Sequence, residues 1–166
     1  VSLAIAEKHP KNILGIGLIN STTLEDSPEK KENRDKTAQF IRNHQASFFL
    51  KTFVPNLFAE NNRLKLQEEI DFVIAMGENL DEDLLADYML AMKHRPDRSH
   101  LLIRNKNFLF VGGENDTGIS LEDNKYQVLR LKNSNNAHVL QNVGHMSMYE
   151  APEELLSVVD SFLKSL

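Results

Sequence analysis

Asp116 and His145 are the two residues of this sequence whose types and positions best suit a chemical role. Each follows an apolar run that predicts a buried strand, and ligands of open parallel sheets bind outside the carboxyl ends of the strands. A carboxylate beside an imidazole fixes the tautomer of the ring and stabilises the imidazolium that forms when the ring accepts a proton from a nucleophile. Spacing alone leaves a second interpretation open, in which Asp116 caps a turn and His145 is a structural histidine beside a glycine.

The elements that must position this pair alternate between helices and strands. Apolar runs predict strands at 13–20, 108–112 and 137–141. Apolar faces and helix-start signals predict helices at 1–9, 124–131 and 152–166. The second strand is entered from the polar Asn105-Lys106-Asn107. With right-handed crossovers, this order predicts an α/β fold containing part of a doubly wound, mostly parallel sheet.

Residues 22–98 separate the first two strands and are predicted to be mostly helical. Ser27 is the expected N-cap of the first helix, with Pro28 at its first position. Irregular apolar spacing around Pro55 predicts two short helical pieces. Two further helices have apolar faces, one from Leu66 to Ile74 and one from Leu84 to Met92.

Composition excludes several classes of function. The chain has 166 residues, a formal net charge of −5 and no cysteine. Without cysteine there is no disulfide, thiolate metal site or cysteine nucleophile, and the cytoplasm is the expected compartment. No Lys/Arg-rich block predicts a nucleic-acid partner, and no apolar run predicts a membrane span.

Several stretches resemble the α/β-hydrolase family, in its lid-bearing esterase and haloperoxidase-like branch. Phe-Leu-Phe-Val-Gly-Gly-Glu-Asn-Asp, ending at Asp116, resembles the strand and loop of the family's catalytic acid. Asn-Val-Gly-His-Met, containing His145, resembles its histidine loop, and Glu-Ala-Pro-Glu-Glu at 150–154 resembles the start of its closing helix. The resemblance implies a core at 1–21 and 99–166 and a helical lid at 22–98. Ser21 and Thr22 follow the carboxyl end of the first predicted strand and are therefore candidate substrate contacts, with the alternative that they are only polar residues at the entrance to the lid.

One part of the family's pattern is missing. The Gly-x-Ser-x-Gly elbow that carries the nucleophile should lie just before Val1, as should the oxyanion-hole donors. Ser2 falls within the helix after the elbow and cannot replace the nucleophile. The first helix also starts without an N-cap residue, so we expect this sequence to be the C-terminal part of a longer protein and to be inactive alone.

Three short motifs resemble those of other protein classes, but the predicted structure around each motif does not fit that class. Asp116-Thr117-Gly118 matches aspartic proteases, which are mostly β-structure. The glycines of Gly15-x-Gly17 lie within a predicted strand rather than after it, unlike those of a dinucleotide fingerprint. His94 and His100 lack a metal-ligand spacing, so neither a metal nor another cofactor is expected.

The predicted function is therefore hydrolysis of a carboxylic ester or similar acyl compound by the complete protein. Two alternatives remain: a dehalogenase or epoxide hydrolase with an Asp nucleophile, and a binding or interaction protein that has kept the fold without its chemistry. Besides a small ester-like substrate, the unpaired edge of the strand at 13–20 predicts a protein partner or a second copy of the chain.

Overall fold

A three-stranded parallel sheet forms the centre of the first of two compact units in the computed structural model, which describes residues 1–104 and 107–166. The strands are β1 (Ile16–Ile19), β2 (Phe108–Gly113) and β3 (Ala137–Leu140), in the order β1-β2-β3. Ile16 pairs with Phe108, and Phe110 with Ala137. All of β2 is buried, as the central strand of a sheet covered on both faces should be.

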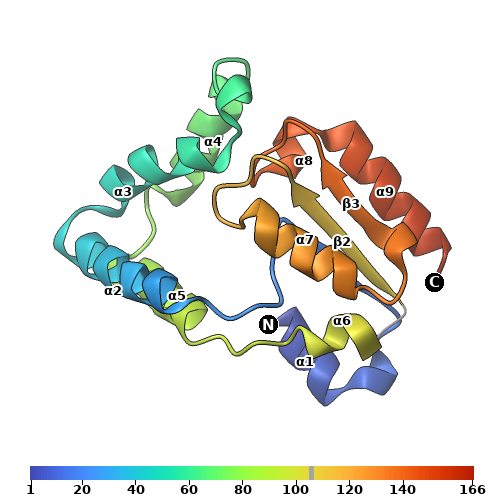
Figure 1. Cartoon of the computed structure of the whole chain (residues 1–166). Coiled ribbons are helices and arrows are strands. Elements are labelled where there is room, and N and C mark those ends of the chain that lie inside the picture. Colours follow the sequence, from blue (N-terminus) through green and yellow to red (C-terminus); the bar gives the residue numbers. More distant parts are fainter. Residues whose placement is uncertain (105–106) are drawn as a thin grey trace. The chain divides into compact units, whose positions relative to one another are not determined.

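Helices cover both faces of this sheet (Figure 1). One face packs against α1 (Ser2–Lys8), α6 (His100–Arg104) and α7 (Leu121–Arg130) through an apolar cluster that includes Phe108 and Phe110. The other face packs against α9 (Pro152–Lys164) through Leu109, Val111 and Phe162. Burying one such side chain stabilises the fold by about 1.5–3 kcal/mol, so the alternating side chains of β2 fix both layers.

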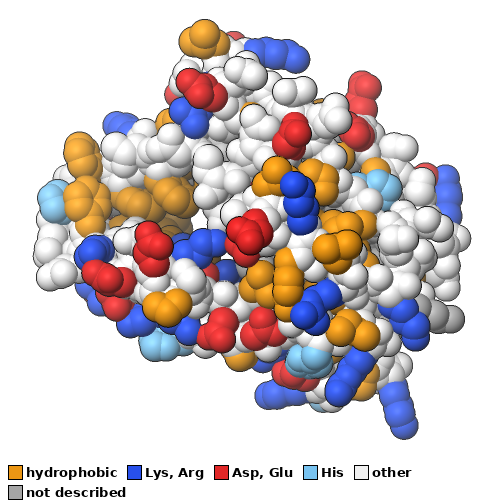
Figure 2. Space-filling view, viewed as in Figure 1, with side chains coloured by type: hydrophobic (Ala, Val, Ile, Leu, Met, Phe, Trp, Pro, Cys, Tyr) orange, Lys and Arg blue, Asp and Glu red, His pale blue; other side chains and the backbone are white. Residues whose placement is uncertain are grey.

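Figure 2 shows the outer surface over α7, where apolar side chains are mixed with charged ones. Leu129 is 85% exposed in this helix, whereas Asn124 and Gln127 are fully buried. The guanidinium of Arg130 lies 4.3 Å from the centre of the Tyr126 ring, within cation–π distance. Isolated exposed apolar residues of this kind are normal on a protein surface.

The second compact unit is helical and is made of residues 24–56 and 63–97. Its helices are α2 (Pro28–Asn43), α3 (Ala46–Phe53), α4 (Gln67–Gly77) and α5 (Glu82–Lys93). Helix α2 packs against α5, and α3 against α4. The buried carboxylate of Asp26 binds Arg95 at 2.6 Å and Arg34 at 3.1 Å, which fixes the entry to this unit.

Residues 57–62 belong to the sheet unit, although they lie between the two stretches of the helical unit. The role of residues 22–98 as a lid stays a prediction, as do the proposed core boundaries. The remaining elements are short: η1 (Pro10–Asn12), η2 (Val54–Leu57), η3 (Glu60–Asn62), η4 (Ser134–Asn136) and α8 (Ser147–Glu150). No helix in the described part of the chain is long and apolar enough to cross a membrane.

Side-chain caps begin three of the α-helices in the described residues, α2, α5 and α7. The Ser27 hydroxyl accepts a hydrogen bond from Lys30 N at 3.2 Å, which confirms the predicted cap, and Asp81 caps α5 in the same way. Helix α7 starts at Leu121, earlier than predicted, because the Ser120 hydroxyl accepts from Asp123 N at 3.0 Å. Strand β1 is shorter than predicted, and the polar entry predicted at Asn105 and Lys106 lies outside the described residues.

Candidate active site

Asp116 lies in the loop that follows β2, at the carboxyl end of the central strand. Its carboxylate is fully buried, and Oδ1 accepts hydrogen bonds from Gly118 N at 2.8 Å and Ile119 N at 3.0 Å. Two backbone donors on one oxygen hold the carboxylate plane in place. These two hydrogen bonds cap the turn after Asp116, so the capping role that the sequence left open for this residue is present.

His145 lies in the loop that follows β3, and its imidazole contacts the same carboxylate. Its Nδ1 is 2.9 Å from Asp116 Oδ2 and 3.1 Å from Oδ1. Because an ionised carboxylate only accepts, the ring donates from Nδ1, which leaves the lone pair of a neutral imidazole on Nε2. The ring is about one-third exposed, so a reacting group can reach it. The predicted contact between Asp116 and His145 is confirmed, whereas their catalytic role stays a prediction.

The two loops contact each other where they leave the sheet. Asn115 N donates to Val143 O at 2.8 Å, and Glu114 N donates to Leu140 O at 2.9 Å. A Cβ added at Gly113 would lie 2.1 Å from Gly144 O, far inside an ordinary van der Waals contact. Gly113 therefore lets the acid loop and the histidine loop approach closely enough for Asp116 to reach His145.

Asn20 supports the histidine loop from the end of β1, a role that the sequence did not reveal. Its backbone has a positive φ of 43°, which asparagine tolerates better than most residues, and its side chain is buried. Asn20 Nδ2 donates to Gly144 O at 2.9 Å, and its Oδ1 accepts from the hydroxyl of Ser147. Asparagine at a strand end is a common turn signal, so its sequence position alone could not assign these contacts.

Ser21 and Thr22, the predicted substrate contacts, follow β1 at the same edge of the sheet as Asp116 and His145. Both side chains are partly buried. Their role in binding a substrate stays a prediction. Ser2 is the first residue of α1 and is exposed, as expected of a residue outside the site.

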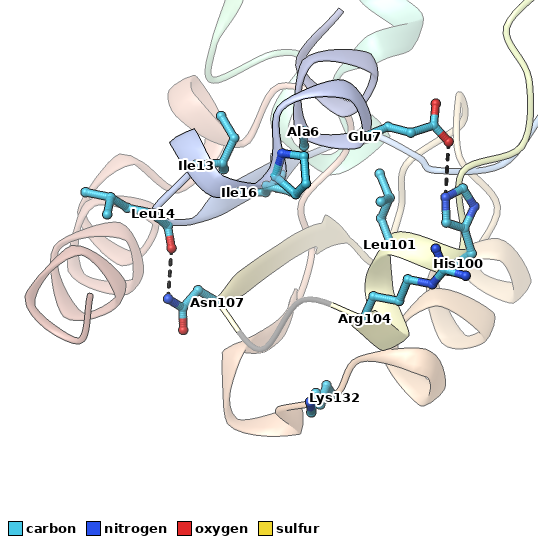
Figure 3. Close-up of a pocket in the computed structure, with 11 residues that line it drawn as sticks. Ala6, Glu7, Ile13, Leu14, Ile16, His100, Leu101, Arg104, Asn107 and Lys132 are labelled. Carbon is cyan, nitrogen blue, oxygen red and sulfur yellow. Dashed lines mark hydrogen bonds and ion pairs between the residues drawn. The ribbon is translucent and has the colours of Figure 1, made fainter.

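A cavity of about 530 Å³ lies at the opposite, amino ends of the strands (Figure 3). Its apolar side chains include Ala6, Ile16 and Leu101. At its rim, His100 Nε2 lies 3.1 Å from Glu7 Oε1, within hydrogen-bond distance. This cavity is separate from the edge that carries Asp116, and the described residues contain no cluster of acidic and histidine side chains that could hold a metal ion.

The chain matches no protein-family model and no curated protein sequence, but it is similar to several solved structures. A thermophilic esterase from Thermogutta terrifontis is 26% identical, with a TM-score of 0.88 over 99% of this chain and 61% of that one. An α/β hydrolase from a deep-sea metagenome library is 19% identical, with a TM-score of 0.76 over 98% and 60%. The enol-lactonase from Burkholderia xenovorans is 17% identical, with a TM-score of 0.77 over 98% and 60%.

This chain has the α/β-hydrolase fold. The predicted resemblance and the predicted fold class are both confirmed. The chain spans about three-fifths of the length of these solved structures, which are hydrolases that include esterases and a lactonase.

Proposed function

We propose that Asp116 and His145 are the acid and the base of a serine-hydrolase triad that acts on carboxylic esters or similar acyl compounds. The observation that supports this most directly is the 2.9 Å contact between Asp116 Oδ2 and His145 Nδ1 at the carboxyl end of a parallel sheet. The buried carboxylate and the partly exposed ring suit a fixed orienting group and an accessible base.

In the proposed reaction, His145 Nε2 accepts the proton of a serine hydroxyl as that oxygen attacks the carbonyl carbon of the substrate. The imidazolium that results is stabilised by Asp116 and then protonates the leaving alcohol. Water hydrolyses the acyl-enzyme by the same proton transfers in reverse. A lactone is a cyclic ester and would react by these steps, and two of the similar structures are named for action on lactones.

We propose that the nucleophile lies upstream of Val1, at the turn preceding α1. The serines nearest the pair in sequence already have structural roles. The Ser147 hydroxyl is buried and donates to Asn20, whereas the Ser120 hydroxyl caps α7. The hydrogen bonds of the His145 ring described above are made by Nδ1, to Asp116.

An esterase assay tests this proposal with p-nitrophenyl acetate at pH 7–8. The 166-residue chain is compared with a version that includes the residues encoded upstream, and a fluorophosphonate probe reports a reactive serine. We expect the 166-residue chain to be silent and the longer protein to hydrolyse the ester and take up the probe. His145→Ala should lower turnover by about 10⁶-fold and Asp116→Asn by about 10⁴-fold.

His9→Ala is the matched control, because this histidine is exposed in α1's C-cap and has no part in the proposed site. It should leave turnover unchanged. Ester hydrolysis by the 166-residue chain that survives His145→Ala would refute the assignment. An upstream elbow with Asp in place of Ser would instead indicate dehalogenase or epoxide-hydrolase chemistry.

A further inference from the structure

A carboxylate that the proposed reaction does not use lies against the backbone on both sides of His145. It belongs to Glu150, the last residue of α8, which is partly buried. Its Oε1 accepts hydrogen bonds from Gly144 N at 2.9 Å and Met146 N at 3.3 Å. Gly144 and Met146 are the immediate neighbours of His145, so one oxygen binds the two amides that flank the histidine.

The second oxygen of Glu150 binds a segment distant in sequence. Oε2 accepts from Ala59 N at 2.8 Å and from Asn62 Nδ2 at 2.8 Å. The same segment binds His145 directly, because His145 N donates to Leu57 O at 2.7 Å. Three consecutive amides of the histidine loop are thus satisfied, two by Glu150 and one by Leu57.

These contacts require a carboxylate rather than an amide of the same shape. All four partners of Glu150 are N–H donors. A glutamine has one accepting oxygen and one NH₂ group that only donates. In either orientation, its NH₂ would face two donors and leave them without an acceptor.

We propose that Glu150 is the positioning residue of His145: it binds the amides of Gly144 and Met146, the residues on either side of the histidine, and thereby directs the imidazole toward Asp116. This proposal rests on His145 being the base of the proposed reaction. Glu150 acts through the backbone, and its function is to keep Nδ1 on the Asp116 carboxylate and Nε2 available to the nucleophile. A misplacement of about 1 Å at such a group can lower a rate by about 100-fold.

Proton NMR of the 166-residue chain tests this without any catalytic readout. The His145 Nδ1 proton that is bound to Asp116 should give a downfield resonance, which Asp116→Asn removes and so assigns. We expect Glu150→Gln to remove or shift this resonance while the far-UV circular dichroism stays unchanged. Glu154→Gln is the matched control, because Glu154 is exposed in the first turn of α9, and it should leave the resonance in place.

Amide hydrogen exchange provides a second measurement that holds even if Glu150→Gln fails to fold. In the unmodified chain, Gly144 and Met146 amides should exchange at least about tenfold more slowly than unprotected loop amides. Exchange at the unprotected rate would overturn the proposal. An unchanged Nδ1 resonance in a folded Glu150→Gln chain would overturn it too.

Kinetics of the longer protein separate this proposal from the proposed function. Glu150→Gln should lower kcat by about 10- to 100-fold with KM unchanged, since orientation rather than substrate binding is lost. An equal effect of Glu154→Gln would refute the positioning role. If the longer protein has no esterase activity, the proposed function fails, while the NMR and exchange results still decide whether Glu150 positions His145.

Discussion

Gly113→Ala should disrupt the contact between the acid loop and the histidine loop. The added Cβ would lie 2.1 Å from Gly144 O and 2.4 Å from Val143 O, where ordinary contacts begin near 3.4 Å. Both obstructing atoms are backbone carbonyl oxygens, so no side-chain rotation relieves the clash and the histidine loop must move by about 1 Å. Overpacking of this kind costs about 1–3 kcal/mol, and we expect the upper end, about 3 kcal/mol.

Gly17→Ala is the matched control for this substitution. Gly17 also lies in a strand, but a Cβ there would meet nothing within 4 Å. Its effect on the free energy of unfolding should stay within about 0.5 kcal/mol, as for most exposed sites. The pair therefore separates the clash from the general effect of glycine substitution on the unfolded chain.

Urea unfolding followed by far-UV circular dichroism measures both variants. With a slope of about 2 kcal/mol per molar urea, a loss of 3 kcal/mol lowers the midpoint by about 1.5 M. The Nδ1 resonance of His145 should also be lost in Gly113→Ala, because the histidine loop is displaced from Asp116. A midpoint equal to that of Gly17→Ala would show that the two loops move apart freely, and the rigid contact inferred from the structure would be wrong.

Three further substitutions test the packing of the two units. Asp26→Asn removes the charge that binds Arg95 and Arg34 and should destabilise the helical unit by about 2–3 kcal/mol, somewhat less than a fully buried pair because both arginines are partly exposed. Asp83→Asn removes one partner of an exposed ion pair and should cost less than about 1 kcal/mol by the same urea measurement. If Asp26→Asn and Asp83→Asn destabilised the chain equally, the larger contribution expected of the buried Asp26 would be wrong. Phe110→Ala should cost about 3–5 kcal/mol in the sheet unit because the side chain is fully buried, and a loss below 1 kcal/mol would show that the sheet core collapses around the gap.

The sequence predicted the fold where the local signals were strong. Strand β2 begins at Phe108 as predicted, because its short apolar run is bounded by loop signals, as expected of a strand covered on both faces. Helix α6 was not predicted, since five residues are too few to show an apolar period. The early start of α7 was missed although Ser120 and Asp123 carry a recognisable cap signal.

The candidate site was predicted only in part. Asp116 and His145 follow strands, and topology brings the carboxyl ends of neighbouring parallel strands together, so their contact could be anticipated. The role of Glu150 could not, because it binds main-chain amides, and the sequence does not encode which amides a loop presents. Residues 57–62 were assigned to the predicted lid for a related reason: nothing local shows that they pack with the sheet unit.

The pairing of β1 with β2 has a consequence for synthesis of the chain on the ribosome. Ile16 pairs with Phe108, so roughly 90 residues must be added before β1 meets its neighbour, whereas only about 27 separate the paired residues of β2 and β3. At about 5–20 residues per second, β1 emerges some 5–18 seconds before β2 is made. During that interval β1 has not yet paired with β2, while the helices of the 24–97 region are already being completed. The late arrival of β2 therefore leaves the β2-facing edge of β1 open to chaperones and to mispairing during this interval.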